Sequence, residues 1–285
     1  MQLTLGYSPC PNDTFLFDAL VNGKIDTQGI SFRVQLGDVE ELNKKAERAE
    51  LDITKLSYHA FAFAHSSYAL LYSGSALGRN CGPLLITRQP LTKPDHEVLQ
   101  QKVNEWKIAI PGELTTANFL LGIAFPNAQN KIPALFSEIE KMVLINKADA
   151  GLIIHENRFT YQGKGLHKVI DLGEFWETTT GRPIPLGGIA IKRNLPDEIQ
   201  QKVNHLIRKS VEFAFKNPDS SLPYVSQYAQ EMDPEVMKQH IKLYVNDFTV
   251  NLGNEGIEAV EHLYKLAQKY DLIPSMKEPI FINRA

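Results

Sequence analysis

Two kinds of side chain in this sequence could carry chemistry: a histidine that ends an apolar run, and hydroxyls that precede helices. His155 follows the apolar residues 150–154. We expect it to project from a strand tip, where an imidazole can exchange a proton near neutral pH. A histidine in that place can also form only a local hydrogen bond. We take His155 as the leading candidate for a catalytic base.

Hydroxyl groups stand where a strand is expected to give way to a helix. Thr115 and Thr116 follow the expected strand 107–110 and precede an apolar helix that starts near Ala117. Their hydroxyls and the amides of that first helical turn could hold a carboxylate, although the same residues commonly serve as plain helix caps. Ser57 takes a comparable place after residues 52–54, with the same two interpretations.

A loop of small residues, 73–82, contains the arginine Arg79. Its glycines permit positive φ or a close approach of the backbone to a ligand, and the guanidinium group could pair with an anion. A solvated surface arginine is the alternative. We therefore carry Arg79 forward as a candidate ligand contact.

Alternating strands and helices must position these side chains. Strands are expected at residues 3–7, 30–36, 51–54, 107–110, 151–154 and 186–191, and a helix at 132–145, with only helices after residue 191. This order predicts parallel sheets in an α/β fold. The second half repeats the pattern of the first, which favours two lobes with a ligand cleft between them. Residues 1–88 with 191–285 would form the larger, discontinuous lobe and residues 89–190 the smaller one.

Composition excludes several classes of protein. The 285 residues carry 30 basic and 33 acidic side chains, with no basic run that could follow a nucleic acid. The two cysteines, Cys10 and Cys81, lack the spacing of a zinc site or disulfide framework. Glycine-rich nucleotide motifs are absent from the sequence. We expect a small-molecule substrate, neither a nucleic acid nor a membrane partner, and a cytoplasmic location, since no basic leader or apolar span is evident.

Several strings together resemble one enzyme family. The chain is similar to the 1,4-dihydroxy-6-naphthoate synthases, the carbon–carbon lyases of the futalosine route to menaquinone. The resemblance spans most of the sequence and rests on SPCPNDTF at residues 8–15, DITKLS at 52–57, GRNCGPL at 78–84, IHENRFTY at 154–161 and PIPLGG at 183–188.

The resemblance implies a two-lobed, periplasmic-binding-protein-like type II fold and a reaction that needs no metal or organic cofactor. It implies cleavage of cyclic dehypoxanthinylfutalosine, with His155 as the general base. The residues that it places against the substrate are Ser57, Thr115, Thr116 and Ala117, with Asn43 as a further contact. The chain departs from the expected pattern at Asn157, where we expect glycine. Asparagine tolerates the left-handed backbone, so we expect the turn after His155 to be kept.

Two other functions remain open from the sequence. One is chorismate dehydratase of the same pathway, which is not expected to depend on a histidine at position 155. The other is a solute-binding protein for a small organic anion, which predicts saturable binding without turnover. The assembly also stays open, with a homodimer as one form.

Overall fold

The structure is a computed structural model that describes residues 1–91, 95–229 and 233–284. It divides into two compact units, one formed by Met1–Gly78 with Pro185–Ala285 and the other by Arg79–Ile184. Residues 79–88, expected in the larger lobe, thus fall in the second unit, where Leu84–Thr87 (β6) pairs with two strands of that unit. Residues 185–190, expected in the smaller lobe, belong to the first unit. The sequence of a short apolar strand does not indicate which sheet the strand joins, so the domain boundary could not be predicted from sequence.

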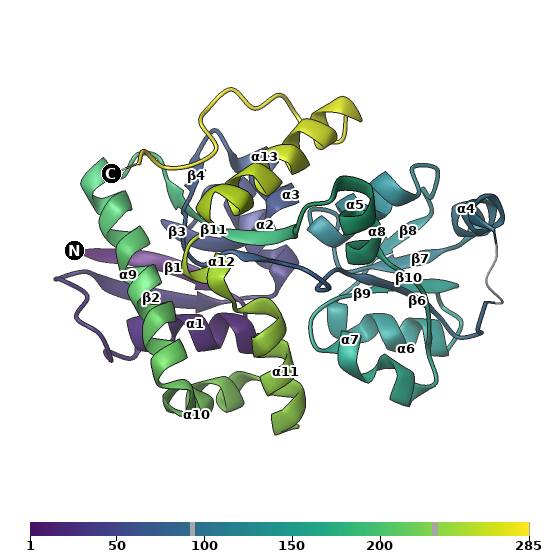
Figure 1. Cartoon of the computed structure of the whole chain (residues 1–285), viewed down its shortest axis with the longest axis horizontal. Coiled ribbons are helices and arrows are strands. Elements are labelled where there is room, and N and C mark those ends of the chain that lie inside the picture. Colours follow the sequence, from purple (N-terminus) through teal and green to yellow (C-terminus); the bar gives the residue numbers. More distant parts are fainter. Residues whose placement is uncertain (92–94, 230–232, 285) are drawn as a thin grey trace. The chain divides into compact units, whose positions relative to one another are not determined.

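The first unit is built on a six-stranded sheet (Figure 1). Its main path runs β2-β1-β3-β11-β4, and β5 pairs with β11. β1 is parallel to both β2 and β3, whereas β11 is antiparallel to β3 and β4. The strands are β1 (Gln2–Tyr7), β2 (Ser31–Leu36), β3 (Ile53–Ser57), β4 (Tyr68–Leu70), β5 (Ala76–Gly78) and β11 (Ile184–Lys192).

Helices cover both faces of this sheet. In Figure 1, α1, α10 and α11 lie on one side of it and α2, α3 and α13 on the other. α1 packs against α9, α10 and α11. The hydrophobic core between these helices and the sheet contains the fully buried Phe17 and Leu206. Burying one such side chain contributes about 1.5–3 kcal/mol. The helices are α1 (Pro11–Val21), α2 (Val39–Glu47), α3 (Tyr58–Ala64), α9 (Asp197–Lys216), α10 (Pro218–Tyr228), α11 (Pro234–Tyr244), α12 (Asp247–Val250) and α13 (Gly253–Lys269).

The second unit contains a five-stranded sheet with the order β10-β6-β9-β7-β8. β7 is parallel to β8 and β9, and β6 is antiparallel to β9 and β10. Its elements are β6, β7 (Ile108–Ile110), β8 (Lys131–Pro133), β9 (Ala150–Ile153), β10 (His167–Asp171), α4 (His96–Glu105), α5 (Thr116–Ala124), α6 (Ile139–Leu144), α7 (Asn157–Thr160), α8 (Leu172–Thr180) and two short 3-10 helices, Phe136–Glu138 and Tyr161–Lys164.

Two sequence expectations are wrong in detail. The helix expected over 132–145 is only α6 with a preceding 3-10 turn, because residues 131–133 form the sheet strand β8. The sheets are mixed and not parallel as expected. The sequence could not decide this, because the period of buried residues in a strand is the same for either strand direction. Among the described residues, no helix combines the length and apolar character needed to cross a membrane.

The repeat expected between the two halves is present in each sheet. In the first unit β1-α1-β2-α2-β3 gives the parallel order β2-β1-β3, and in the second β7-α5-β8-α6-β9 gives β8-β7-β9. The third strand of each repeat therefore lies beside the first. As a result, the residues that follow these two strands share the carboxyl edge of their sheet, which is where open α/β sheets bind ligands.

Candidate active site

His155 lies two residues beyond β9, at the carboxyl edge of the second sheet. Its backbone has φ 57°, in the left-handed region that non-glycine residues seldom occupy. The side chain is half-buried, and its ring packs edge-on against Phe136, with the ring centres 5.0 Å apart. Strained backbone of this kind concentrates at functional sites. His155 thus stands just beyond the end of a strand, as expected from the sequence.

The turn after His155 is held by a buried hydrogen bond. Asn157 Nδ2 donates to Glu140 Oε2 at 2.7 Å, and Lys164 Nζ lies 2.6 Å from the same oxygen. Asn157 begins α7 and is absent from the residues with positive φ. The explanation offered from sequence, in which asparagine stands in for a left-handed glycine, is thus wrong: the left-handed residue is His155, and Asn157 is a hydrogen-bond donor.

Arg158 joins this turn to two other segments. Its guanidinium group contacts Asp171 Oδ2 at 2.6 Å and donates to the Gly82 carbonyl at 2.5 Å. Asp171 Oδ1 in turn accepts from the amide of Gly173 at the start of α8. Because the ion pair is largely buried and each partner has further hydrogen bonds, it ties the turn firmly to α8.

The glycine of the small-residue loop serves this packing. A Cβ atom on Gly82 would lie 2.2 Å from the backbone nitrogen of Gly173. The close approach expected from sequence is real, but the neighbour is the chain's own backbone. Burial raises the pKa of the adjacent Cys81 thiol to about 12, although Arg158 opposes the shift. A thiol in this state is unreactive near neutral pH.

Thr115 is the N-cap of α5. Its hydroxyl accepts from the Asn118 amide at 3.2 Å and donates to the Gly112 carbonyl at 2.8 Å. Of the two interpretations of this side chain, capping is thus the one that the geometry displays. Thr116 and Ala117 form the buried first turn of α5. Since β7 and β9 are parallel neighbours, this turn and His155 lie at the same edge of the second sheet.

Ser57 and Asn43 form a reciprocal pair in the first unit. Asn43 Nδ2 donates to Ser57 Oγ at 3.1 Å, and the Ser57 amide donates to Asn43 Oδ1 at 2.9 Å. Ser57 precedes α3 without capping it through its side chain, unlike Thr115. It also ends β3, the third strand of its repeat, so its topological counterpart in the second unit is His155 rather than the start of α5.

Arg79 contacts an acidic side chain of its own unit. Its guanidinium is exposed and 4.0 Å from Glu177 on α8, and the Asn80 amide donates to the other Glu177 oxygen at 2.6 Å. The structure therefore assembles His155 with the start of α5, and Asn43 with Ser57, and places Arg79 beside an acidic partner.

Two polar residues that were not among the candidate site residues form a buried ion pair in the first unit. Lys55, inside the buried strand β3, has its ammonium group 3.4 Å from Asp13 Oδ1. A lysine amid buried strand residues needs a partner for its charge. That position in DITKLS was the available signal, but it does not say which acid provides the pairing.

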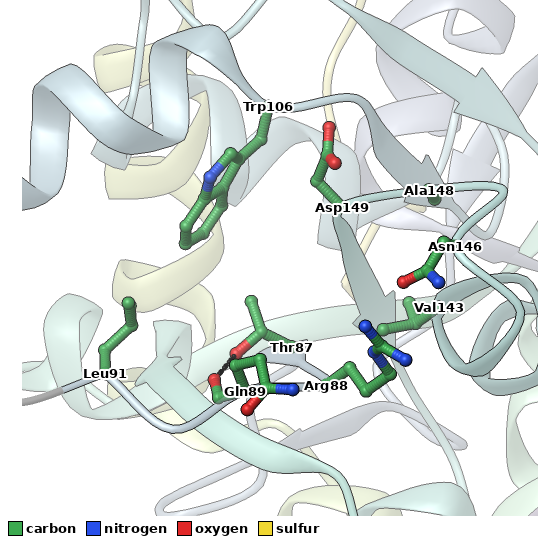
Figure 2. A pocket seen from close by; sticks show the side chains of 9 residues that line it. All are labelled: Thr87, Arg88, Gln89, Leu91, Trp106, Val143, Asn146, Ala148 and Asp149. Carbon is green, nitrogen blue, oxygen red and sulfur yellow. Dashed lines mark hydrogen bonds between the residues drawn. The ribbon is translucent and has the colours of Figure 1, made fainter.

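A cavity of about 240 Å³ lies elsewhere in the second unit (Figure 2). Trp106 and Arg88 lie on opposite sides of it in this view, with Asp149 near Trp106 and Ala148 near Asn146. Residues 148 and 149 precede β9, whereas His155 follows it. The cavity is therefore at the opposite edge of the sheet from the candidate catalytic residue and is not part of the site described above.

The fold defines a class of protein. The chain matches the alkanesulfonate-binding protein SsuA from Xanthomonas axonopodis pv. citri with a TM-score of 0.69, over 96% of this chain and 95% of that one, at 14% identity. Similarity at this level concerns the fold alone. The expected periplasmic-binding-protein-like α/β fold is confirmed.

The family follows from sequence. A model of the menaquinone biosynthesis family matches residues 3–269, and the chain belongs to that family. The structure of protein AF1704 from Archaeoglobus fulgidus is also similar, with a TM-score of 0.88 and 34% identity over 95% of this chain and 98% of that one.

Two curated relatives carry the same enzyme name. The 1,4-dihydroxy-6-naphthoate synthase of Streptomyces coelicolor is 43% identical over 96% of this chain and 95% of its own length. The enzyme of that name from Thermus thermophilus is 41% identical over 98% of this chain and 99% of its own. The family resemblance inferred from the five sequence strings is confirmed.

Proposed function

We propose that the chain catalyses the 1,4-dihydroxy-6-naphthoate synthase reaction of menaquinone biosynthesis. It is a carbon–carbon lyase that converts cyclic dehypoxanthinylfutalosine into 1,4-dihydroxy-6-naphthoate and a small sugar-derived fragment. The full-length similarity to two enzymes of that name supports the reaction. The observation that carries the residue assignment is the left-handed, half-buried His155 at the carboxyl edge of its sheet.

His155 acts as the general base in this proposal. It removes a hydroxyl proton from the sugar-derived part, and the oxygen electron pair forms a carbonyl as the neighbouring carbon–carbon bond breaks. The electrons of that bond pass into the ring system as an enolate. The imidazolium returns its proton, and protonation of the enolate oxygen gives the aromatic naphthalenediol. A well-placed base contributes about 10²–10⁴-fold to such a step. Formation of the aromatic ring supplies the driving force.

The remaining residues bind the substrate. The Ser57 hydroxyl and the first turn of α5, with Thr116 and Ala117, supply donors for the carboxylate and the developing enolate. Thr115 fixes that turn through its cap. Asn43, whose amide bonds Ser57 twice, holds the serine in place. Arg79 would contribute its charge at the periphery of the ligand.

The decisive experiment uses purified protein and cyclic dehypoxanthinylfutalosine. We expect the naphthoate chromophore to form with wild-type protein. Asparagine tolerates φ 57°, so the His155→Asn variant should keep the fold and ligand binding and lose about 10²–10⁴-fold in kcat. His167→Asn is the matched control, since His167 is exposed on β10, and it should behave like wild type.

Each rival outcome has a separate meaning. Saturable binding of the substrate without turnover by wild-type protein indicates a solute-binding protein. Consumption of chorismate instead indicates the dehydratase. Near-normal turnover by His155→Asn removes the imidazole from the mechanism while leaving the reaction assigned.

Thr116→Val should mainly raise KM, and an unchanged KM places the carboxylate elsewhere. The proposal also puts the enzyme in the cytoplasm, which cell fractionation tests.

A further inference from the structure

The loop after β1 and the first turn of α1 contain a buried polar network that the proposed mechanism does not use. Asp13 is 2% exposed. Its Oδ2 accepts from the Ser8 hydroxyl at 2.8 Å and the Ser8 amide at 3.2 Å, and its Oδ1 accepts from Asn12 Nδ2 at 2.8 Å. Lys55 Nζ, 3.4 Å from Oδ1, also donates to the Gly74 carbonyl at 2.8 Å. A buried ion pair requires such additional hydrogen bonds to both of its charged groups.

His240 fixes the direction of this network from a distant part of the sequence. It is fully buried on α11, and its Nε2 lies 2.9 Å from Asn12 Oδ1. A carboxylate only accepts hydrogen bonds, so Asn12 must turn its NH₂ toward Asp13 and its oxygen toward His240. Nε2 is then the donor. The hydrogen bonds run in one direction, from His240 to Asn12 to Asp13.

Topology connects this network to the edge where Ser57 lies. β1 and β3 are parallel neighbours, so the residues after β1 and the end of β3 share one edge of the sheet. Lys55 and Ser57 are two residues apart in β3, and their side chains therefore lie on the same face. Lys55 is the link between the Asp13 carboxylate and the strand end that carries Ser57.

The two units use the same topological place differently. α1 and α5 each follow the first strand of their repeat. The first turn of α5 carries the buried Thr116 and Ala117, whereas the first turn of α1 carries Asn12 and Asp13, whose polar atoms bond other groups of the protein. In the first unit, the first turn of α1 therefore holds neighbouring groups of the protein in place.

We infer that His240 and Asn12 are positioning residues for substrate binding. They orient the Asp13 carboxylate, which holds Lys55 and thereby fixes the Ser57 end of β3 for the substrate. This role rests on the proposed function and involves no contact between His240 and substrate. Loss of the Nε2 donor lets the Asn12 amide rotate, weakens the hold on Lys55, and loosens the strand end.

The test compares two substitutions of one residue. His240→Phe keeps an aromatic ring beside Tyr244, whose ring centre is 4.7 Å from that of His240, but has no donor. His240→Gln keeps an N–H donor. With cyclic dehypoxanthinylfutalosine, His240→Phe should raise KM about tenfold, the effect of losing one hydrogen bond's net contribution, with kcat little changed. His240→Gln should stay near the wild-type KM.

The split between KM and kcat separates positioning from folding. A merely structural role reduces the amount of active enzyme, which lowers the apparent kcat at unchanged KM; that result overturns the inference. An equal rise of KM in both variants overturns the role given to the donor. If His240→Phe does not fold, Asn12→Ala tests the other end of the bond and should raise KM likewise.

The proposed function is judged separately by wild-type protein. If wild-type protein neither binds nor converts the substrate, the proposed function fails and this inference fails with it. If wild-type protein converts the substrate while the folded His240→Phe and Asn12→Ala variants keep its KM, only the inference fails.

Discussion

Replacing Asn157 by glycine should destabilise the protein, although glycine is the residue that the family resemblance leads us to expect there. If position 157 needed a left-handed backbone, glycine would be neutral or stabilising. The structure gives the opposite expectation, because Asn157 has ordinary helical geometry at the start of α7 and its side chain donates to the buried Glu140 carboxylate at 2.7 Å.

The size of the effect follows from two losses. Removing a hydrogen bond to a charged group costs about 1.5–3 kcal/mol. Glycine in a helical position adds about 0.5–1 kcal/mol of backbone entropy. Asn157→Gly should therefore lower the unfolding free energy by about 2–4 kcal/mol. At roughly 2–4 °C for each kcal/mol, Tm should fall by roughly 4–16 °C. Urea unfolding followed by circular dichroism measures the first quantity and calorimetry the second.

Asn146 provides the matched control within the same unit. It is exposed, follows α6 and has φ 57°, so it occupies the left-handed position that often ends a helix. Asn146→Gly should be neutral or stabilise by up to about 1 kcal/mol. Equal or greater stability of Asn157→Gly relative to wild type would refute the assignment of its side chain as a buried donor.

Three other predictions concern the packing and charges around the two sheets. Gly82→Ala places a methyl group 2.2 Å from the Gly173 nitrogen, so urea unfolding should show a loss of about 1–3 kcal/mol; unchanged stability would mean that the loop can move away. Cys81, whose pKa burial raises to about 12, should react with iodoacetamide at about pH 8 more than a hundredfold more slowly in native than in denatured protein, and rapid native labelling would contradict its burial. Burial acts to raise the pKa of Asp52, but hydrogen bonds from Thr4 and the ammonium group of Lys192 outweigh it and lower the pKa. The ionised Asp52 therefore stabilises the fold above the unfolded pKa of 3.8, and this stabilisation is lost as the pH falls through the lower pKa of the folded protein. Asp52→Asn should therefore flatten the fall of stability in acid, and an unchanged slope would contradict the shift.

Periodicity was enough to predict several of the strands and the repeat that they form. The alternation of residues 3–7 and the apolar run before His155 each correspond to an observed strand, β1 and β9. The expectation that polar candidates follow the carboxyl ends of strands also depended on this periodicity. These features depend on local sequence and on the geometry of parallel pairing.

Strand direction and long-range pairing could not be predicted in this way. β6 and β11 have the buried pattern of any central strand, and nothing within them states that they run antiparallel to their neighbours. The contact between Asn12 and His240 joins residues 228 positions apart. Such partners are selected by the complete fold, and neither residue has a local signature of the other.

The left-handed backbone of His155 bears on why a histidine is found there. For an L-residue this conformation costs roughly 1–2 kcal/mol, which glycine would avoid. Selection for stability alone would therefore favour glycine at this position. The surrounding hydrogen bonds of Asn157 and Arg158 instead hold the strained turn together. An imidazole held at an energetic cost, half-buried at the carboxyl edge of its sheet, is better explained by its chemistry than by its packing.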